Sequence, residues 1–255
     1  MATRKLINKA SICTLARSYN ILDYYQNLKT VVSHAYSHNL NNCPKQDLHW
    51  LINELLLENY TGESTLKAKL ADLFIQKNVI ATFEIKVNTS RVDFLTINGE
   101  SKSFEIKSEL DNLYKLSKQT TDYEKVFDEN HIVIDEKHYS KAVKLIPDHY
   151  GIIVLHGHQL TIEKGASPNI KLNPEMQLNL FSKKELAQTF KLPGITTEEI
   201  LINYEPGEIN MIFKEMLKKR YTKRWQFLID NRNDIYPIDY QFFFQHNIQP
   251  AIIYT

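Results

Sequence analysis

The segment RVDFLTINGESKSFEIK, residues 91–107, carries the pattern that decides the fold. Apolar and polar residues alternate along it on both sides of Asn98-Gly99, a pair that is typical of tight turns between strands. The preceding segment IATFEIKV, residues 80–87, alternates in the same way. The pattern therefore predicts three consecutive strands, at about 80–87, 91–97 and 102–107.

The segments around these strands predict helices and further strands. Ser64 can cap a helix over TLKAKLADLFIQKN, and the capping-box sequence SELD at Ser108 predicts a helix from about Glu109 to Phe127. Short apolar runs predict strands at 131–134 and 150–155, with a short helix between them. We therefore expect an α/β fold, a mixed sheet flanked by helices. Its segments would be an N-terminal helical part (1–60), a core (60–165) and a C-terminal helical region packing on the core (166–255).

The C-terminal region is expected to hold three helices. They cover MQLNLFSKKELAQTF, then TTEEILIN with Thr196 or Thr197 as its cap, then EINMIFKEMLKKRYTKRWQFLID.

The composition of the chain limits the classes of protein to which it can belong. The 255 residues include 31 basic and 30 acidic side chains, which give a net charge of +1. This balance does not exclude nucleic acid, because a binding groove needs only local positive charge. No stretch of 18 apolar residues occurs, and Cys13 and Cys43 show no metal-type spacing. We expect a cytoplasmic protein with no membrane contact and two free thiols.

Three charged residues of the strand pair are candidates for catalysis. In a strand, Glu105 and Lys107 share one face while Phe104 and Ile106 take the other. Asp93 joins them only if the loop at Asn98-Gly99 has an odd number of residues. A three-residue loop with Gly99 in the left-handed conformation meets that condition, and we expect it.

Two carboxylates and an ammonium group on one sheet face suit phosphodiester hydrolysis. Mg²⁺, or Mn²⁺, prefers carboxylates, waters and a substrate phosphate as ligands, and it lowers the pKa of a bound water. A nearby lysine can orient that water or offset the charge of the transition state. The pattern also fits solvated charges on an exposed sheet face. Glu84-Ile85-Lys86 repeats the spacing and is not expected to join the site.

The helix predicted after the third strand adds a polar row. Asp111, Lys115, Gln119 and Tyr123 follow one another at intervals of four residues, so they share one helix face. Because the helix leaves directly from the Glu105–Lys107 strand, its row is expected to overhang the site. Gln119 and Tyr123 are then candidates to bind phosphate oxygens or waters of the metal.

The run RVDF…FEIKSELDNLYKLSKQTTDYEKVFD resembles the PD-(D/E)xK nuclease superfamily, and Gln119-x3-Tyr123 resembles the extra motif of its RecB-like branch. It also resembles a poorly characterised bacterial and phage family of presumed nucleases known by a locus-tag name. Residues 80–155 carry the resemblance, and NLFSKKELAQTF and PIDYQFFF look similar to later parts of that family. Lys115 stands where arginine is usual. The resemblance implies a restriction-endonuclease-like core.

The same resemblance implies roles for single residues. Asp93 and Glu105 would hold the metal ion, with the carbonyl of Ile106 as a further ligand, and Lys107 would attend the attacking water. Arg91 would contact phosphate or pair with Glu105, and both alternatives stay open. The source of an additional acidic ligand is also open, among Glu54, Glu58, Glu63 and Glu84.

Two further groups of residues have alternative interpretations. Basic residues crowd into 211–232 around Tyr221 and Trp225 and could face nucleic acid or only solvent. The candidates for nucleic-acid contact there are Lys219, Arg220, Lys223 and Arg224. His156-x-His158 could chelate a metal ion, although a surface pair at a strand end is the simpler interpretation.

The function expected from the sequence is a metal-dependent nuclease, acting on DNA in phage defence, restriction or repair. The alternative is a catalytically silent nuclease fold that binds a protein or DNA, as an immunity or regulatory protein. A third hypothesis is a toxin or host-takeover factor that acts on RNA. DNA against RNA, ends against interior, sequence specificity, and a homodimer or protein partner stay open. Because Lys107 is expected to face outward, its truncation is expected to leave folding nearly unchanged.

Overall fold

The computed structural model describes residues 8–35, 40, 42–157 and 159–255. Contacts divide the chain into two compact units. The first comprises Met1–Leu73 with Phe227–Thr255, and the second is Phe74–Gln226. The segment 1–60 thus falls in the first unit and nearly all of 60–165 in the second. The region 166–255 is shared between the two units.

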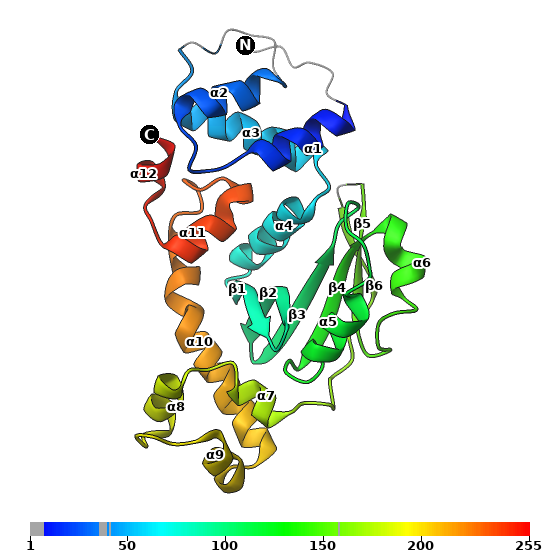
Figure 1. The fold of residues 1–255 in the computed structure, drawn as a ribbon, viewed down its shortest axis with the longest axis vertical. Helices are drawn as coiled ribbons and strands as arrows, with labels where there is room; N and C mark the ends of the chain where they lie inside the picture. Colours follow the sequence, from blue (N-terminus) through cyan, green and yellow to red (C-terminus); the bar gives the residue numbers. More distant parts are fainter. Residues whose placement is uncertain (1–7, 36–39, 41, 158) are drawn as a thin grey trace. The chain divides into compact units, whose positions relative to one another are not determined.

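A six-stranded sheet organises the second unit (Figure 1). The strands follow one another in sequence order across the sheet. The first three pair antiparallel, the third to fifth pair parallel, and the last pairs antiparallel with the fifth. They are β1 (Ile80–Val87), β2 (Ser90–Asn98), β3 (Glu100–Lys107), β4 (Glu129–Asp135), β5 (Gly151–His156) and β6 (Gln159–Lys164). The predicted α/β class is confirmed, while β6 was not predicted.

Two layers of side chains cover the two faces of this sheet. On one face, Phe74 stacks on Phe94 at 5.8 Å between ring centroids and contacts Phe104 at 5.6 Å. Trp225 approaches Phe94 from the same cluster at 6.0 Å. Glu105 follows Phe104 in β3, so it belongs to the opposite face. Helices α5 (Leu116–Tyr123) and α6 (Tyr139–Ala142) pack on β4 and β5 within one apolar cluster (Figure 1).

The predicted helix at 109–127 is wrong in its first half. Residues 108–115 form a turn-rich connection, and α5 begins only at Leu116. The Asp111 carboxylate accepts hydrogen bonds from the backbone N–H of Ser108 at 2.8 Å and from its hydroxyl at 2.5 Å. These bonds close a local turn instead of starting a helix, because short polar side chains offer the backbone such alternatives.

Two helices of the C-terminal region begin at capping boxes, of which only the one at Thr196 was predicted. Ser182 and Thr196 each form a capping box, with Glu185 and Glu199 respectively. The cap at Ser182 also divides the helix that was predicted as one over MQLNLFSKKELAQTF. The remaining elements of the second unit are η1 (Glu136–His138), α7 (Pro174–Leu178), α8 (Lys183–Phe190), α9 (Thr197–Asn203) and α10 (Pro206–Asp230), whose last turn belongs to the first unit.

The first unit is helical, as predicted for its N-terminal part. Its apolar core includes Leu28, Leu48, Ile52 and Leu55. Its elements are α1 (Lys9–Ser18), α2 (Tyr25–Ser33), α3 (Lys45–Asn59), α4 (Glu63–Gln76, which continues into the second unit), η2 (Pro237–Asp239), α11 (Tyr240–His246) and α12 (Pro250–Tyr254). Ser64 lies inside α4, so the predicted cap there is wrong. Among the described residues, no helix combines the length and apolar character needed to cross a bilayer.

Candidate active site

The hairpin between β2 and β3 sets the positions of the predicted catalytic residues. Phe94 pairs with Phe104 and Asn98 pairs with Glu100, so the same register places Asp93 opposite Glu105. Gly99 takes a φ of +75° at the tip, with nothing within 4 Å of the position that a Cβ would occupy. The expected odd number of loop residues and the left-handed glycine are therefore confirmed, although the pairing leaves Gly99 alone in the loop and not three residues.

The two strands separate just where Asp93 and Glu105 face each other. Backbone pairing between β2 and β3 extends to Phe94 and Phe104. Beyond that point, the Asp93 carboxylate accepts a hydrogen bond of 2.7 Å from the backbone N–H of Ile106. A side-chain oxygen thus takes the place of a strand carbonyl. Asp93 is 9% exposed, so its carboxylate is fixed in a narrow opening of the sheet.

Glu105 is 1% exposed and is surrounded by donors. Lys107 Nζ lies 2.5 Å from Glu105 Oε1, and the Tyr123 hydroxyl lies 2.8 Å from Oε2. The same hydroxyl lies 2.7 Å from the backbone oxygen of Arg91, so its single proton has two acceptors. Burial is the reason for this set of partners, because an ionised carboxylate away from water needs hydrogen bonds to persist. The glutamate expected on an open face is an interior group.

Burial and charge act on the pKa values of this group in opposite directions. Burial raises the pKa of Glu105, against the lowering effect of Lys107, Tyr123 and Gln119. Burial alone would lower the pKa of Lys107, but the neighbouring carboxylates of Glu105, Asp93 and Asp111 outweigh it and raise that pKa. Burial and the charge of Glu105 raise the pKa of Tyr123. Lys107 is therefore an ammonium at neutral pH, and Tyr123 is a protonated donor.

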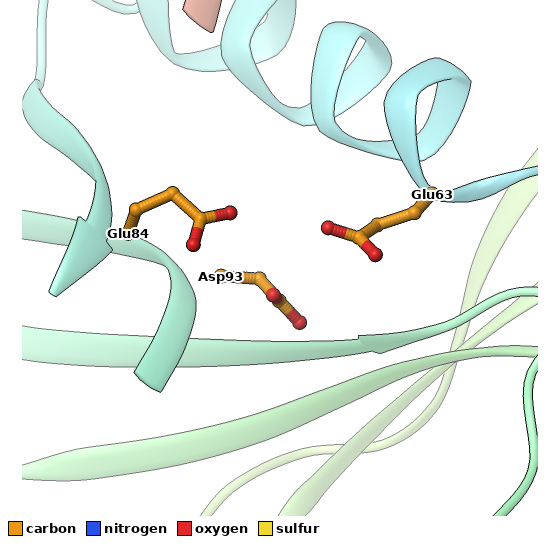
Figure 2. A group of neighbouring side chains, drawn as sticks. All are labelled: Glu63, Glu84 and Asp93. Atoms are coloured by element: carbon orange, nitrogen blue, oxygen red, sulfur yellow. The ribbon is translucent and has the colours of Figure 1, made fainter. Parts of the chain in front are cut away.

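Glu84 belongs to the first ExK, Glu84-Ile85-Lys86, which was expected to stay apart from the site. Phe83 pairs with Phe94 and Ile85 pairs with Val92, which places Glu84 opposite Asp93. Glu84 has a φ of +60° and interrupts the ladder between β1 and β2. One carboxylate oxygen of Glu84 and one of Asp93 lie within 4.8 Å of each other. Figure 2 shows the two side chains side by side. Glu84 thus lies beside Asp93, in line with its place among the candidates for an additional acidic ligand, although its ExK was expected to stay apart.

The pair formed by Glu84 and Asp93 fits a divalent cation. Two oxygens bound to one Mg²⁺ at about 2.1 Å each can be at most about 4.2 Å apart, so small side-chain rotations would close the pair on an ion. Glu105 is not part of this pair, since its oxygens are held by Lys107 and Tyr123. Figure 2 also labels Glu63, at the start of α4 in the first unit, where it pairs with Lys67.

Arg91 and Lys86 have their own places near this pair. Arg91 forms an ion pair with Glu84, not with Glu105, and its own side chain is mostly exposed. Lys86 lies opposite Arg91 in the ladder and lines a surface cavity with Asn88 and Met176. The first ExK lysine therefore takes no part in the acidic pair.

The polar row expected on one helix is divided by the late start of α5. Gln119 and Tyr123 lie on α5, and the Tyr123 hydroxyl hydrogen-bonds Glu105. Asp111 instead binds Ser108, and Lys115 is exposed at the N-cap of α5. The Gln119 side-chain oxygen is buried and has no hydrogen-bond partner among the described residues. This acceptor is available to a water or other donor near Glu105.

The basic side chains of α10 fall into two groups. One group is bound to other parts of the protein, and the other is exposed. The Arg220 guanidinium donates to both oxygens of Glu185 at 2.7 and 2.8 Å, and it lies 4.5 Å from the ring centroid of Phe181. Arg220 is thus engaged in packing α8 against α10. Lys219, Lys223 and Arg224 are exposed, and their contact with nucleic acid stays a prediction.

The histidine pair at the end of β5 can be followed only in part, because His158 lies outside the described residues. His156 hydrogen-bonds Glu136 at 2.9 Å and Glu163 at 3.3 Å on the exposed end of the sheet.

Comparison with known proteins gives one family match. Residues 29–243 match the family described as "Bacteriophage P4 protein cII". No curated protein matches the sequence. A solved structure, described as a protein of unknown function from Silicibacter pomeroyi, is similar at 19% identity with a TM-score of 0.34. The match covers 44% of this chain and 76% of that one.

Proposed function

We propose that this chain, which belongs to the bacteriophage P4 protein cII family, is a metal-dependent nuclease that hydrolyses phosphodiester bonds in DNA. The proposal adopts the PD-(D/E)xK resemblance of residues 80–155, with Asp93, Glu105 and Lys107 as its central residues. Phage defence, restriction or repair are settings in which such an activity would serve.

The observation that carries the proposal is the burial of Glu105 beside Lys107. A salt bridge of 2.5 Å with a carboxylate that is 1% exposed is a costly arrangement, because both ions lose their water. Apolar side chains of similar size would serve stability as well or better. Charged groups kept in such a place, next to the acidic pair of Glu84 and Asp93, are characteristic of sites that do chemistry.

Each group has a role in this proposal. Asp93 and Glu84 would hold Mg²⁺ or Mn²⁺, which polarises the phosphate and activates a water when bound. Lys107 would leave Glu105 to orient that water or to offset the charge that develops on the phosphate oxygens. Tyr123 and Gln119 would keep Glu105 in position, with the free oxygen of Gln119 receiving a hydrogen bond from a bound water.

The test is cleavage by the purified chain with Mg²⁺ or Mn²⁺. The substrate panel comprises single-stranded, duplex and branched DNA and also RNA. Cleavage should stop with EDTA and should fall at least about 100-fold in Lys107→Ala, Asp93→Asn and Glu84→Gln. Lys86→Ala is the matched control, since it removes the lysine of the first ExK and should cleave at the normal rate. Loss in Lys86→Ala alone would move the site away from β3.

The alternative is a silent nuclease fold that binds DNA or a protein. It is favoured by the same contacts at Glu105, because Lys107 and Tyr123 already occupy both of its oxygens. A wild-type chain that binds DNA or a partner and cleaves nothing in the panel would make this the better assignment. Cleavage of RNA alone would support the third hypothesis.

A further inference from the structure

The connection between β3 and α5 carries an exposed aromatic side chain. Tyr114 is 92% exposed, although the neighbouring Leu113 packs against the apolar cluster of α5, α6, β4 and β5. A tyrosine is a large ring whose burial usually contributes strongly to a core or an interface. The folded chain therefore leaves the ring of Tyr114 in solvent, while the neighbouring Leu113 makes the apolar contact with the core.

This connection is fixed at both ends to the candidate active site. It begins immediately after Lys107 and ends at α5, whose Gln119 and Tyr123 contact Glu105. Even a fully extended chain would keep Tyr114 within about 25 Å of Lys107, and the turn closed by Asp111 shortens that reach.

The connection is also held from within and from the side. The backbone N–H of Tyr114 donates to the Asn112 side chain at 3.2 Å. His138 Nε2 lies 3.1 Å from the backbone oxygen of Ser108, and Lys137 donates to the backbone oxygen of Glu109. A ring displayed on a held connection loses little conformational entropy when it binds.

An exposed lysine stands next to Tyr114 in the sequence, in a connection that also carries Glu109 and Asp111. This lysine is Lys115, and the segment η1–α6 that supports the connection continues with exposed lysines. Those lysines are Lys141 and Lys144. Aromatic rings interleaved with lysines form the usual surface for single-stranded nucleic acid, since every base offers a face for stacking and every nucleotide a phosphate.

We propose that Tyr114 stacks on an unpaired base of the DNA strand and that Lys115 contacts the adjacent phosphate, so the site prefers single-stranded DNA and frayed ends to an intact duplex. This inference rests on the proposed nuclease function, and it names the substrate class. Inside a duplex both faces of each base are covered by its neighbours, so only an unpaired or terminal base can stack on the ring.

The experiment measures binding apart from cleavage. Fluorescence anisotropy is recorded on the full chain with a labelled single-stranded oligonucleotide and with its duplex, with Ca²⁺ replacing Mg²⁺. The flexible coordination of Ca²⁺ allows binding at the acidic pair, and a gel run afterwards verifies that the strand is intact. Tyr114→Ala should weaken binding of the single strand by about 5- to 150-fold. Tyr114→Phe should bind normally, because its ring still stacks.

Controls separate this inference from the proposed function. Tyr24→Ala removes a ring that is 84% exposed in the first unit and should not change binding. Lys115→Ala should lower the slope of log K against log salt by about 0.7, the value for one phosphate contact on a single strand. Normal single-strand binding by Tyr114→Ala overturns the inference, even if the wild type cleaves DNA. Equal loss on the duplex, or binding of RNA alone, also overturns it. The predicted binding losses support it even if no cleavage is found.

Discussion

Glu105 is a carboxylate that the fold keeps almost entirely from water, and its charge depends on a few side chains. Lys107 provides the cation, while Tyr123 provides a neutral donor. The alternation of β3 correctly placed Glu105 and Phe104 on opposite faces. It could not show that α5 covers the face of Glu105, because that depends on packing between elements. Lys107 shares the face of Glu105, as expected, but its side chain is mostly buried against that carboxylate instead of being exposed. The effect of its truncation on folding stays a prediction, and the buried salt bridge now favours a loss of stability.

The first prediction concerns the stability of Lys107→Ala. Removal of the ammonium leaves Glu105 buried without a counter-charge, which should lower the free energy of unfolding at pH 7 by about 3–5 kcal/mol. Urea titration measures this change. In a Glu105→Gln background, the same Lys107→Ala change should cost much less, since no buried charge is left. Equal costs in the two backgrounds would show that the salt bridge is not the cause.

A second buried carboxylate, Asp239, lies in the first unit within a network that contains no cation. It accepts hydrogen bonds from Tyr19 at 3.0 Å, Tyr254 at 2.9 Å and Asn53 at 3.2 Å. His49 Nδ1 lies 2.8 Å from the Tyr19 hydroxyl. Burial raises the pKa of Asp239 to about 7 and lowers the pKa of His49 to about 4.

These two pKa changes have opposite effects on stability. Between about pH 4 and 6.5, the folded chain holds its proton on Asp239, whereas the unfolded chain holds it on His49. The folded and the unfolded state therefore bind the same number of protons at these two residues. In this pH range the network adds no pH dependence to the free energy of unfolding. In Asp239→Asn, only the unfolded state binds the proton, so stability should rise with pH by up to about 1.4 kcal/mol per pH unit.

The control for this second prediction is a variant whose stability should change with pH in the opposite direction. In His49→Gln, only the folded state binds a proton, on Asp239, so stability should fall as pH rises from about 4 to about 7. Chemical denaturation at intervals of half a pH unit measures both slopes. Slopes of the same sign in the two variants would contradict the assigned positions of the proton.

At the scale of elements, local signals predicted the hairpin well and α5 poorly. The period of two and the Asn98-Gly99 turn are local, so β1, β2 and β3 and the register of β2 against β3 could be inferred from sequence alone. The register of β1 against β2, which brings Glu84 opposite Asp93, was not inferred. Ser108 and Asp111 form a signal that suits a capping box and a closed turn equally well, and the turn is what forms. Strand β6 was missed because it is a short, exposed and charged edge strand, QLTIEK, without a buried face to give it a pattern.

The third prediction concerns the contact between α8 and α10. Glu185 closes the capping box of α8 and receives both hydrogen bonds of Arg220. Arg220→Ala should therefore lower the unfolding free energy by about 1.5–3 kcal/mol. Arg220→Lys should restore little of it, since an ammonium cannot reproduce the two parallel bonds.

Substitution of Arg220 should affect stability but not DNA binding. Arg220→Ala should leave the salt dependence of DNA affinity unchanged, because its guanidinium is already engaged. If α10 contacts duplex phosphates, Lys223→Ala should lower that slope by about 0.9 while stability stays nearly constant. A lowered slope in Arg220→Ala would return this arginine to the nucleic-acid interface.

At the scale of the whole molecule, the first unit is formed from both ends of the chain. Ile238 packs with the core of α1–α3, and Tyr254 contacts His49 at 5.0 Å between ring centroids. Sequence patterns describe neighbours along the chain, so they indicated helices at both ends but not that the ends share one core. The second unit is continuous in sequence, and the helices at its borders contribute to its core through Phe74 of α4 and through Phe213, Leu217 and Trp225 of α10.

The last prediction follows from this organisation and addresses the open acidic ligand. A fragment of residues 61–231 retains α4 and α10 whole, together with the sheet and the candidate site. It should fold, as judged by circular dichroism and a cooperative unfolding transition, because the cores that cover the sheet lie between residues 74 and 226. It retains Glu63 and Glu84 but lacks Glu54 and Glu58. If Glu84, or Glu63, completes the metal site, the fragment should cleave DNA with Mg²⁺, and its Lys107→Ala form should not. A folded fragment without activity, beside an active full-length chain, would instead assign the ligand to the missing part of the first unit. Glu54→Gln and Glu58→Gln in the full chain would then identify it. A fragment that does not fold would contradict the independent stability of the second unit.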